Sequence, residues 1–377
     1  MVFPTVRSLP VLMYHSISRR ESKRTVSPEL FADHCASLVR AGWRGLTLAE
    51  AEAYFLRQGK LPRKTCLITF DDGYLDNYLV AAPILRQYGL CGVIFPVMAL
   101  VAKEGVLRSP EKTPDLDSPP SVMRKGQLVR AEQFCSVTEL REMMRQGVMT
   151  PAPHSLRHER VAVSPEFSWL MCPGGVRGYF SMPTYGAVWG MPAFKLRHGL
   201  ASRAFRPSAR LLRLVRSRVP QKWDEALEYL SVPTNTEGLI KDIQHLETQG
   251  LLGAMESEEQ YRARLFKEFT ACRSRFSRMF GVSPVSFCWP WGDYNYIALE
   301  EARRAGFRLF FTTAIGANAL PQPHRVHRFK VDSIAGSRLL WQIRAMALRP
   351  VAAIAGAWLR RSQNRSQKNL AREQDDE

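Results

Sequence analysis

The chain has 377 residues, of which 45% are hydrophobic, so it is long enough for one large domain or two modest ones. A formal net charge of +18 attracts phosphates, nucleic acid or anionic lipid surfaces. Seven cysteines without a CxxC pair exclude a disulfide scaffold and a cysteine metal cluster, and they predict a reducing compartment. With no readable signal peptide and no apolar run of about 18 residues, we expect a cytoplasmic protein.

The first part of the chain alternates between strand and helix patterns. The stretch LPVLMYHSI predicts a strand that ends at His15, and two helices around a Gly-Trp turn are expected between residues 28 and 59. An apolar, β-prone run at 66–70 predicts a strand covered on both faces, which Gly73 ends with a turn.

The same alternation continues beyond this strand. A helix, a glycine stop and another buried strand are predicted between residues 77 and 97. Ser136, followed three residues later by Glu139, marks the start of a helix that ends near Gly147. Strands that alternate with helices in this way predict an α/β fold with parallel strands.

Two adjacent acids, Asp71 and Asp72, follow directly on the buried strand. In α/β folds with parallel strands, active sites are usually built at the C-terminal ends of the strands, where the loops converge. The alternative is ordinary turn chemistry, in which Asp71 only caps the following segment.

Two histidines, His154 and His158, lie four residues apart in PAPHSLRHERVAV. On one turn of helix this spacing puts both imidazoles on one side, close enough to bind one ion, although exposed loop histidines are also common. Together with a carboxylate, the pair makes a set of ligands that leaves positions open for water and substrate, as a hydrolytic metal site requires.

These residues belong to motifs of a known family. The combination of TFDDGY at 69–74 with HSLRH at 154–158 is specific. The other matching pieces are VLMYHSI at 11–17, TELREMMRQGV at 138–148, the segment 258–295 that contains CWPWGDYN, AGFRLFFTT at 305–313 and HRFKV at 327–331. On these pieces, about two thirds of its length, the chain resembles the polysaccharide deacetylases of the NodB-homology class, carbohydrate esterase family 4. Its nearest branch is that of the poly-N-acetylglucosamine deacetylases.

The resemblance implies a fold, a metal and a division of roles. It implies a distorted (β/α) barrel with about seven strands and one divalent metal ion, usually zinc. Asp72, His154 and His158 would be the metal ligands, and Asp71 the general base that takes the proton of the attacking water. A metal centre activates water and polarises the acetamide carbonyl, while a neighbouring carboxylate collects the proton.

The general acid that protonates the departing amine is expected to be a histidine, since a pKa near neutrality suits this task. The branch that the chain resembles uses the N-terminal motif's histidine, here His15; its alternative role is a hydrogen bond within the barrel. His324 and His327 are rival candidates. The chain has Cys288 where many family members have an arginine that orients the catalytic aspartate, and Arg328 is the predicted replacement, with a simple surface charge as the alternative.

Aromatic residues gather in the CWPWGDYN segment. Trp289, Pro290, Trp291 and Tyr294 are predicted to form an apolar wall that contacts a sugar ring. The alternative is that these residues belong to the core, which is common for aromatic residues at strand ends.

We expect the barrel to be interrupted by a large insertion. The predicted division is a first barrel part at 1–159, an insertion at 160–255, a second barrel part at 256–335 and a basic C-terminal tail at 336–377. Basic amphipathic segments are predicted within 195–222 and 337–365, with Trp341 and Trp358 in the second one. Each segment either binds an anionic membrane surface or packs its apolar face on the protein's own core.

Two functions of different classes follow from these observations. The first is a metal-dependent hydrolase that removes acetyl groups from an N-acetylated amino sugar in a surface glycan or in its lipid- or nucleotide-linked precursor. The second is an inactive deacetylase-fold protein that binds a polyanion or glycan through its basic insertion. Nucleic acid is not an expected partner, because no RNA-binding module or helix-turn-helix pattern is present.

Overall fold

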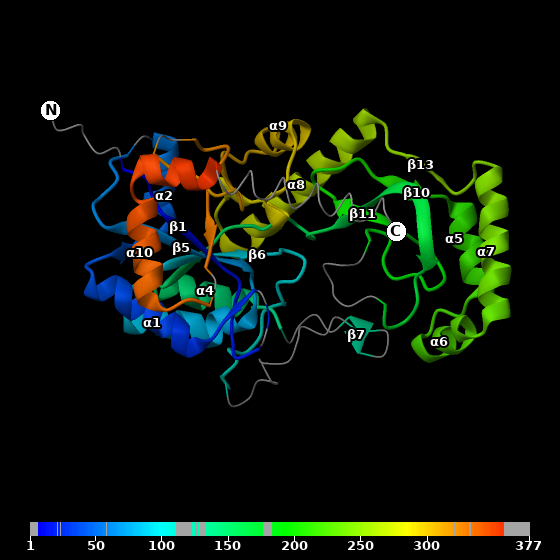
Figure 1. The fold of residues 1–377 in the computed structure, drawn as a ribbon, viewed down its shortest axis with the longest axis horizontal. Helices are drawn as coiled ribbons and strands as arrows, with labels where there is room; N and C mark the ends of the chain where they lie inside the picture. Colours follow the sequence, from blue (N-terminus) through cyan, green and yellow to red (C-terminus); the bar gives the residue numbers. More distant parts are fainter. Residues whose placement is uncertain are drawn as a thin grey trace.

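The protein has an α/β body and a smaller lobe beside it, at the left and right of Figure 1. The computed structural model describes residues 7–20, 22, 24–57, 59–110, 133–175, 183–319, 322–331 and 333–357, and the backbone of 123–124 and 127–128. In this part of the chain, no helix is long and apolar enough to cross a membrane.

The centre of the body is a parallel sheet. Its path runs through β16 (Phe329–Lys330), β1 (Val11–Tyr14), β5 (Thr65–Asp72), β6 (Gly92–Pro96) and β9 (Met149–Pro151), and β4 (Arg44–Gly45) pairs with the start of β5. Every residue of β5 is buried. This burial explains why the strand is apolar almost throughout rather than alternating, since both of its faces are covered.

Two further parallel strands extend this arrangement toward a barrel. These are β14 (Ser286–Cys288) and β15 (Leu309–Phe311). The Cys288 N–H donates to the Pro153 carbonyl, 3.0 Å away and just beyond β9, while Phe311 bridges in parallel to Val326, shortly before β16. The five strands of the main path and these two make seven strands in succession. The predicted α/β fold with about seven strands is therefore confirmed.

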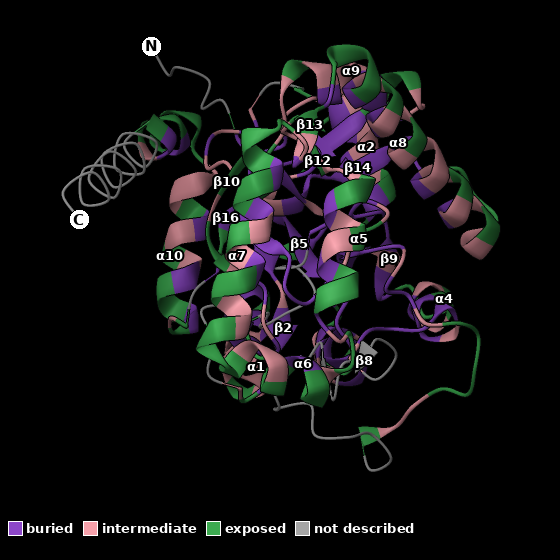
Figure 2. Ribbon diagram, turned by 90° about the vertical axis from the view of Figure 1, so that its right-hand side faces the viewer, coloured by how far each residue is buried: buried purple, intermediate pink, exposed green. Residues whose placement is uncertain are grey.

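Helices cover the outside of the strands. They are α1 (Pro28–Arg40), α2 (Leu48–Arg57), the π-helix Asn77–Ala81 with α3 (Ala82–Gln87), α4 (Val137–Arg145), α8 (Glu258–Phe280), α9 (Tyr296–Arg304) and α10 (Gly336–Met346). The predicted start of α4 is confirmed, because Ser136 and Glu139 form a reciprocal capping box. Figure 2 shows buried strands inside and exposed outer faces on the helices.

The longest helix, α8, shows how a simple pattern builds this packing. Ser257 and Gln260 cap its first turn reciprocally, and Gly281 ends it in the left-handed conformation that glycine adopts without strain. Its buried face consists of residues spaced three or four apart: Tyr261, Leu265, Phe269, Cys272 and Phe276. This spacing places one stripe of the helix against the strands.

The smaller lobe is formed by the elements between residues 160 and 255. They are β10 (Arg160–Leu170), β11 (Pro192–His198), β12 (Phe205–Pro207), α5 (Ala209–Arg218), α6 (Trp223–Ser231), α7 (Pro233–Thr248) and β13 (Gly253–Met255). β10 pairs with β11 and β12 with β13, both antiparallel. The lobe has its own hydrophobic core, which includes Trp189, Phe194 and Ile243.

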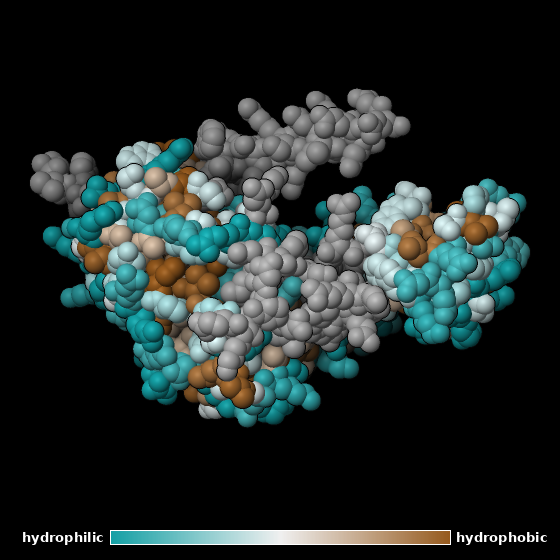
Figure 3. All heavy atoms as spheres, turned by 90° about the horizontal axis from the view of Figure 1, so that it is seen from below, coloured by the Kyte–Doolittle hydropathy of each residue, from teal (hydrophilic) through white to brown (hydrophobic). Residues whose placement is uncertain are grey.

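The sequence left open whether the apolar face of the basic segment at 195–222 packs on the protein's own core, and helix α5 in this segment shows where that face lies. Its apolar residues Leu211 and Val215 are fully buried in the core of the lobe. The apolar side of α5 therefore packs on the protein's own core, as one of the two interpretations of this segment expected. Its arginines lie on the outer side, and the face of the lobe seen in Figure 3 is mostly hydrophilic.

The second amphipathic segment is also partly packed. Leu339 and Ile343 of α10 are fully buried, and α10 contacts α1. Trp341 lies on the other side of the helix and is 69% exposed. Trp358 lies outside the described residues.

Candidate active site

The acid pair lies at the C-terminal tip of β5. Asp71 and Asp72 are both buried, with 2% and 3% of their surface exposed. The backbone of Asp72 has φ 72°, an unusual left-handed conformation that stores strain. At Gly73, φ 77°, a Cβ atom would lie 2.8 Å from Cα of Pro96, so only glycine fits this turn. The turn separates the two acids into different environments.

Asp71 is held by Arg328. Its two carboxylate oxygens accept from Nη1 and Nη2 of Arg328 at 2.6 and 2.8 Å. The guanidinium, which is also buried, donates through Nε to the Thr312 carbonyl at 2.8 Å. Burial opposes the charged form of Asp71, but the positive charge of Arg328 outweighs this effect and lowers the pKa of Asp71 to about 2. Asp71 is therefore ionised and fixed in direction, and Arg328 is not a surface charge.

Asp72 faces the two histidines of the HSLRH segment. Its Oδ1 lies 3.6 Å from Nε2 of His154 and 3.7 Å from Nε2 of His158. One potential ligand atom from each of the three residues lies within 4.8 Å of the other two. The histidines are in a loop and not on a helix, which differs from the geometry that the spacing suggested. Tertiary packing nevertheless brings both imidazoles to one carboxylate.

The loop is shaped so that the imidazoles present Nε2. Nδ1 of His154 lies 2.9 Å from the Cys288 carbonyl, which makes Nδ1 the protonated nitrogen and leaves Nε2 as the acceptor. The backbone N–H of His158 donates to Oγ of Ser155 at 2.8 Å. Ser155 and His158 both have positive φ, 66° and 55°. A loop that turns twice through this strained region depends on its surroundings to keep its shape.

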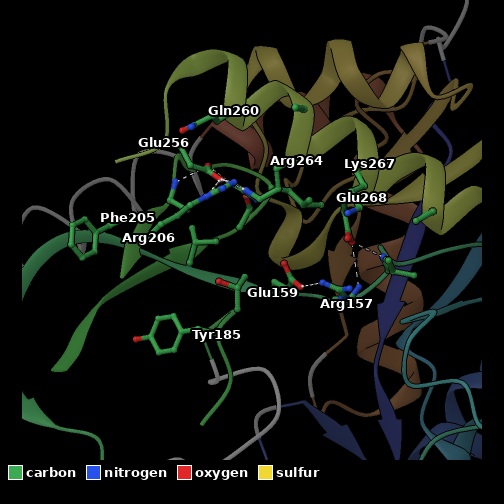
Figure 4. Close-up of a pocket in the computed structure, with 18 of the residues that line it drawn as sticks. Arg157, Glu159, Tyr185, Phe205, Arg206, Glu256, Gln260, Arg264, Lys267 and Glu268 are labelled. Atoms are coloured by element: carbon green, nitrogen blue, oxygen red, sulfur yellow. Dashed lines mark hydrogen bonds and ion pairs between the residues drawn. The ribbon is translucent and has the colours of Figure 1, made fainter. Parts of the chain in front are cut away.

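Glu268 on α8 supplies part of that support. Its Oε1 accepts from the backbone N–H groups of Leu156 and Arg157, at 2.9 and 3.3 Å. Figure 4 shows Glu268 reaching toward the loop, at the edge of a pocket of about 690 Å³ between α8 and the smaller lobe. Burial raises the pKa of Glu268 to about 7. Sequence reasoning missed this residue, because it is 112 positions away from Leu156 and nothing within the segment 258–295 singles it out.

The three facing residues fit a divalent cation. Burial, and next the charge of Asp71, raise the pKa of Asp72 to about 7, so a cation at this position would stabilise the ionised carboxylate. Burial lowers the pKa values of His154 and His158, which keeps both imidazoles neutral, as ligation requires. Two nitrogens and a carboxylate oxygen suit zinc and similar ions.

Asp71, His154 and Cys288 form a second group of potential ligands. This group is less suitable, because both oxygens of Asp71 are bound by a guanidinium and burial raises the pKa of the Cys288 thiol. A cation is therefore favoured at Asp72, and Asp71 stays available for another task.

His15 is the predicted general acid that lies nearest to this centre. Tyr14 of β1 pairs with Phe70 of β5, so the next residues of the two parallel strands, His15 and Asp71, are neighbours. Burial lowers the pKa of His15 to about 4, while the charge of Asp71 opposes this change. In the free protein at neutral pH, the imidazole is therefore uncharged.

The two rival histidines lie elsewhere. Nδ1 of His327 is 3.2 Å from the Ala314 carbonyl, and its ring packs on Gly316. His324 lies among the positive charges of Arg303 and Arg325, which together with burial lower its pKa. The structure thus brings His15, but neither rival, to the acid pair.

The predicted sugar-contacting wall is partly wrong. Trp289 is fully buried, stacked on Tyr294 at 4.9 Å and on Phe310 at 5.4 Å. Pro290 is buried as well. These two side chains are core residues, because β14 carries them inward between α8 and β15.

Trp291, by contrast, lies at the candidate metal centre. Its backbone has φ 55°, and its ring centroid is 4.0 Å from that of His158. The His198 ring from β11 also stacks on the Trp291 ring, with 4.2 Å between the ring centroids and 6° between the ring planes. His198 in turn pairs with Asp293 at 2.7 Å. Sequence reasoning missed His198, which comes from the insertion. The only signal was its position beside the aromatic-rich stretch.

Comparison with known proteins agrees with this fold. Residues 58–169 match the family model described as polysaccharide deacetylase. YxkH of Bacillus subtilis (strain 168), named as a polysaccharide deacetylase, is 48% identical over 90 residues, 24% of this chain and 32% of the relative. The poly-beta-1,6-N-acetyl-D-glucosamine N-deacetylase of Escherichia coli (strain K12) is 24% identical over 298 residues, 78% of this chain and 32% of the relative. The matched part spans about a third of the length of these curated relatives.

Solved structures show the same fold. The chain is 18% identical to a de-N-acetylase from Aggregatibacter actinomycetemcomitans, with a TM-score of 0.58 and coverage of 89% of this chain and 99% of the other. It is also 18% identical to the BpsB deacetylase domain from Bordetella bronchiseptica, with a TM-score of 0.54 and coverage of 88% and 97%.

The strand order and the likeness to these solved structures therefore show a NodB-homology fold. Residues 58–169 match the polysaccharide deacetylase family model, and the resemblance seen in the sequence is confirmed.

Proposed function

We propose that the protein is a metal-dependent hydrolase that removes N-acetyl groups from an amino sugar of a glycan or of its lipid- or nucleotide-linked precursor. The observation that carries this proposal is the division between the two acids. Asp72 faces two neutral imidazoles, while Asp71 next to it is ionised and oriented by Arg328. Amide hydrolysis needs both an electrophilic centre and a nearby proton acceptor.

In this mechanism, Asp72, His154 and His158 would hold a divalent ion, most suitably zinc. When bound, the ion supplies Lewis-acid chemistry that activates water and polarises the acetamide carbonyl. Asp71 accepts the proton of the attacking water at one of its carboxylate oxygens, which Arg328 keeps in a constant direction. Trp291 beside His158 offers an apolar surface against which a sugar ring can lie.

His15 is proposed to protonate the amine as it leaves. Since its resting imidazole is neutral, it takes over the proton that Asp71 has removed from the attacking water and donates this proton to the leaving nitrogen. Its position beside Asp71, at the tip of the neighbouring strand, suits such a transfer.

Metal analysis and hydrolysis of a chromogenic acetyl ester test the proposal together. We expect one divalent ion per chain, ester hydrolysis that stops when the ion is chelated, and recovery after zinc is added back. Asp71→Asn should retain the ion and lose at least about a hundredfold in rate, the usual scale for a general base. An ion-free protein, or hydrolysis that Asp71→Asn leaves intact, contradicts the proposal.

The second candidate is an inactive binding protein that uses the basic lobe. Its support is the exposed positive charge on α5. The complete acid and histidine set favours the enzyme, because a binding protein has no use for an oriented, ionised Asp71 beside a cation site. Glycan or polyanion binding without any acetyl release would favour the binding protein.

We also propose that the protein works peripherally on the inner face of the cell membrane. The exposed side chains Arg210, Arg213, Arg216 and Arg218 support this proposal, and in the described residues only Arg218 of these four has an ion pair, with Asp242 at 2.6 Å. All seven cysteines are unpaired, as expected in a reducing compartment. Each basic residue near an anionic surface contributes about 1 kcal/mol.

Flotation with vesicles tests this location. Binding to vesicles that contain anionic lipid, but not to neutral ones, is expected, and it should be lost at high salt or when the four arginines are changed to serine. Release only by detergent would contradict an electrostatic attachment.

A further inference from the structure

His15, the proposed general acid, lies at a break between two short strands. β1 ends at Tyr14 and β2 (Ser16–Ile17) begins two residues later, so His15 itself belongs to neither strand. Its side chain is half-buried. Among the residues that the structure describes, none hydrogen-bonds to the imidazole ring of His15, and only its backbone carbonyl is bound by a side chain. The direction of the imidazole therefore depends on how the backbone is held at this break.

A buried asparagine on the helix after β5 holds the backbone of His15. Nδ2 of Asn77 donates to the His15 carbonyl at 2.8 Å and to Oδ1 of Asp76 at 2.7 Å. Asn77 is fully buried, and Asp76 has 4% of its surface exposed. Both neighbours of the amide are acceptors, so its NH2 group must face them. The carbonyl of His15 therefore has a fixed donor, 62 positions away in the chain.

Asp76 holds the residue after His15 as well. Oγ of Ser16 donates to Oδ2 of Asp76 at 2.5 Å, and Ser16 is also buried. Hydrogen bonds to a carboxylate are shorter and stronger than those between neutral groups, which suits a fixed geometry. Asp76 and Asn77 together bind the peptide carbonyl of His15 and the side chain of the next residue, so they hold the chain directly at the strand break.

The helix that carries this pair has an unusual shape at the same place. Asn77 begins the π-helix Asn77–Ala81, which continues directly into α3 and contacts β2. A π-turn interrupts the ordinary hydrogen bonds of an α-helix, and such turns are frequent at functional sites. A rare backbone shape and a buried polar pair therefore coincide beside His15.

We propose that Asp76 and Asn77 are positioning residues that fix His15 beside Asp71, so that its imidazole meets the amine as it leaves. This inference rests on the proposed function and adds two residues that act through the general acid. A displacement of about 1 Å can reduce a rate about 100-fold, so a small movement of this backbone should be visible in the kinetics. The alternative is that the pair only stabilises the fold, as buried polar networks often do.

Leaving groups of different basicity test whether the pair acts through His15. The zinc-loaded protein is given para-nitrophenyl acetate, whose leaving group needs no proton, and the acetyl ester of an aliphatic alcohol, whose leaving group does. Asn77→Leu keeps the branching at Cγ but removes the donor. It should slow the aliphatic ester about tenfold more than the nitrophenyl ester, with the metal content unchanged. Ser16→Ala removes only the bond to Asp76, so it should change the ratio of the two rates in the same direction but by less.

Ser286→Ala is the matched control for these variants. Ser286 is buried like Ser16, and its Oγ also donates to a carboxylate, that of Glu52, at 2.7 Å. It begins β14, at the end of this strand that lies away from the candidate active site. In urea denaturation the control should lose about as much stability as Ser16→Ala, while the ratio of the two rates stays unchanged.

A double-variant cycle separates positioning from stability. In the His15→Ala background, Asn77→Leu should have no further effect on the aliphatic ester, because a residue that acts through His15 then has nothing left to position. Equal losses on both esters, or losses that multiply in the double variant, overturn the inference and leave the pair a structural role. A wild-type protein that hydrolyses neither ester contradicts the proposed function instead, so the two failures are distinguishable.

Discussion

The buried pair of Asp71 and Arg328 allows a prediction with a calculable size. In Arg328→Met, the carboxylate loses the guanidinium that donates to both of its oxygens, at 2.6 and 2.8 Å, while remaining buried. Because burial alone raises the pKa of a carboxyl group, that of Asp71 should move from about 2 to well above the ordinary value of 3.8. Asp72, a buried acid with no arginine bound to it, already has a pKa of about 7.

The change in pKa sets the direction of the pH dependence. In the wild type, Asp71 has a lowered pKa, so its stabilisation is present above pH 3.8 and is lost as the pH falls through about 2. The difference between these values corresponds to about 2 kcal/mol. In Arg328→Met the pKa of Asp71 lies above the unfolded value of 3.8, so Asp71 has no effect on folding below pH 3.8 and increasingly opposes folding as the pH rises from 3.8 through the new pKa. The two proteins therefore differ most at neutral pH.

We expect Arg328→Met to lower the free energy of unfolding by about 3 to 5 kcal/mol at pH 7, the usual cost of leaving one buried charge unpaired. Urea denaturation of the zinc-loaded proteins at pH 7 and at pH 5 measures this loss, which should be smaller at pH 5. The acid limb of the pH–rate profile for ester hydrolysis should shift toward neutral pH, because Asp71 must be ionised to act as a base.

A double variant tests the same charge pair even if Arg328→Met alone is very unstable. Asp71→Asn together with Arg328→Met removes both charges, so it should recover more than about 1 kcal/mol relative to Arg328→Met alone. A loss below about 1 kcal/mol at pH 7, or a double variant no more stable than the single one, would refute the role assigned to this pair.

Three further predictions concern the same site. Asp72→Ala, His154→Ala or His158→Ala should each remove most of the bound ion, and full occupancy in all three would contradict the ligand set. His15→Ala should slow hydrolysis of an acetamide much more than that of an activated acetyl ester, because a good leaving group needs no proton; equal losses would indicate a structural role. Glu268→Ala should weaken metal affinity about 10- to 100-fold, since it frees two backbone N–H groups of the ligand loop; unchanged affinity would show that the loop keeps its shape alone.

Short-range patterns in the sequence were sufficient to predict several features of this protein. The buried strand, the acid pair at its tip and the capping box of α4 depend on residues within a few positions of each other. The two motifs with Asp72 and His154 were also specific enough to indicate the family. The strand, the acid pair and the capping box each depend on contacts between residues that are close in the chain, so a local sequence pattern predicts all three.

The tertiary structure decided which distant residues complete the site. The family resemblance offered Arg328 as a candidate, but only the fold shows that it reaches Asp71 across 257 positions, and that Glu268 reaches the ligand loop across 112. No spacing in the chain encodes such contacts, because the order of the strands and the packing of α8 bring these residues together.

The tertiary structure also chose between interpretations that the sequence could not separate. Trp289 and Trp291 are two positions apart, yet the first is fully buried and the second lies beside His158, because the chain turns sharply between them. The apolar stripe of α5 has the pattern of a membrane-binding helix and of a core helix alike. Its burial in the smaller lobe follows from the neighbouring elements that cover it, since an amphipathic pattern specifies that a face is buried but not against what.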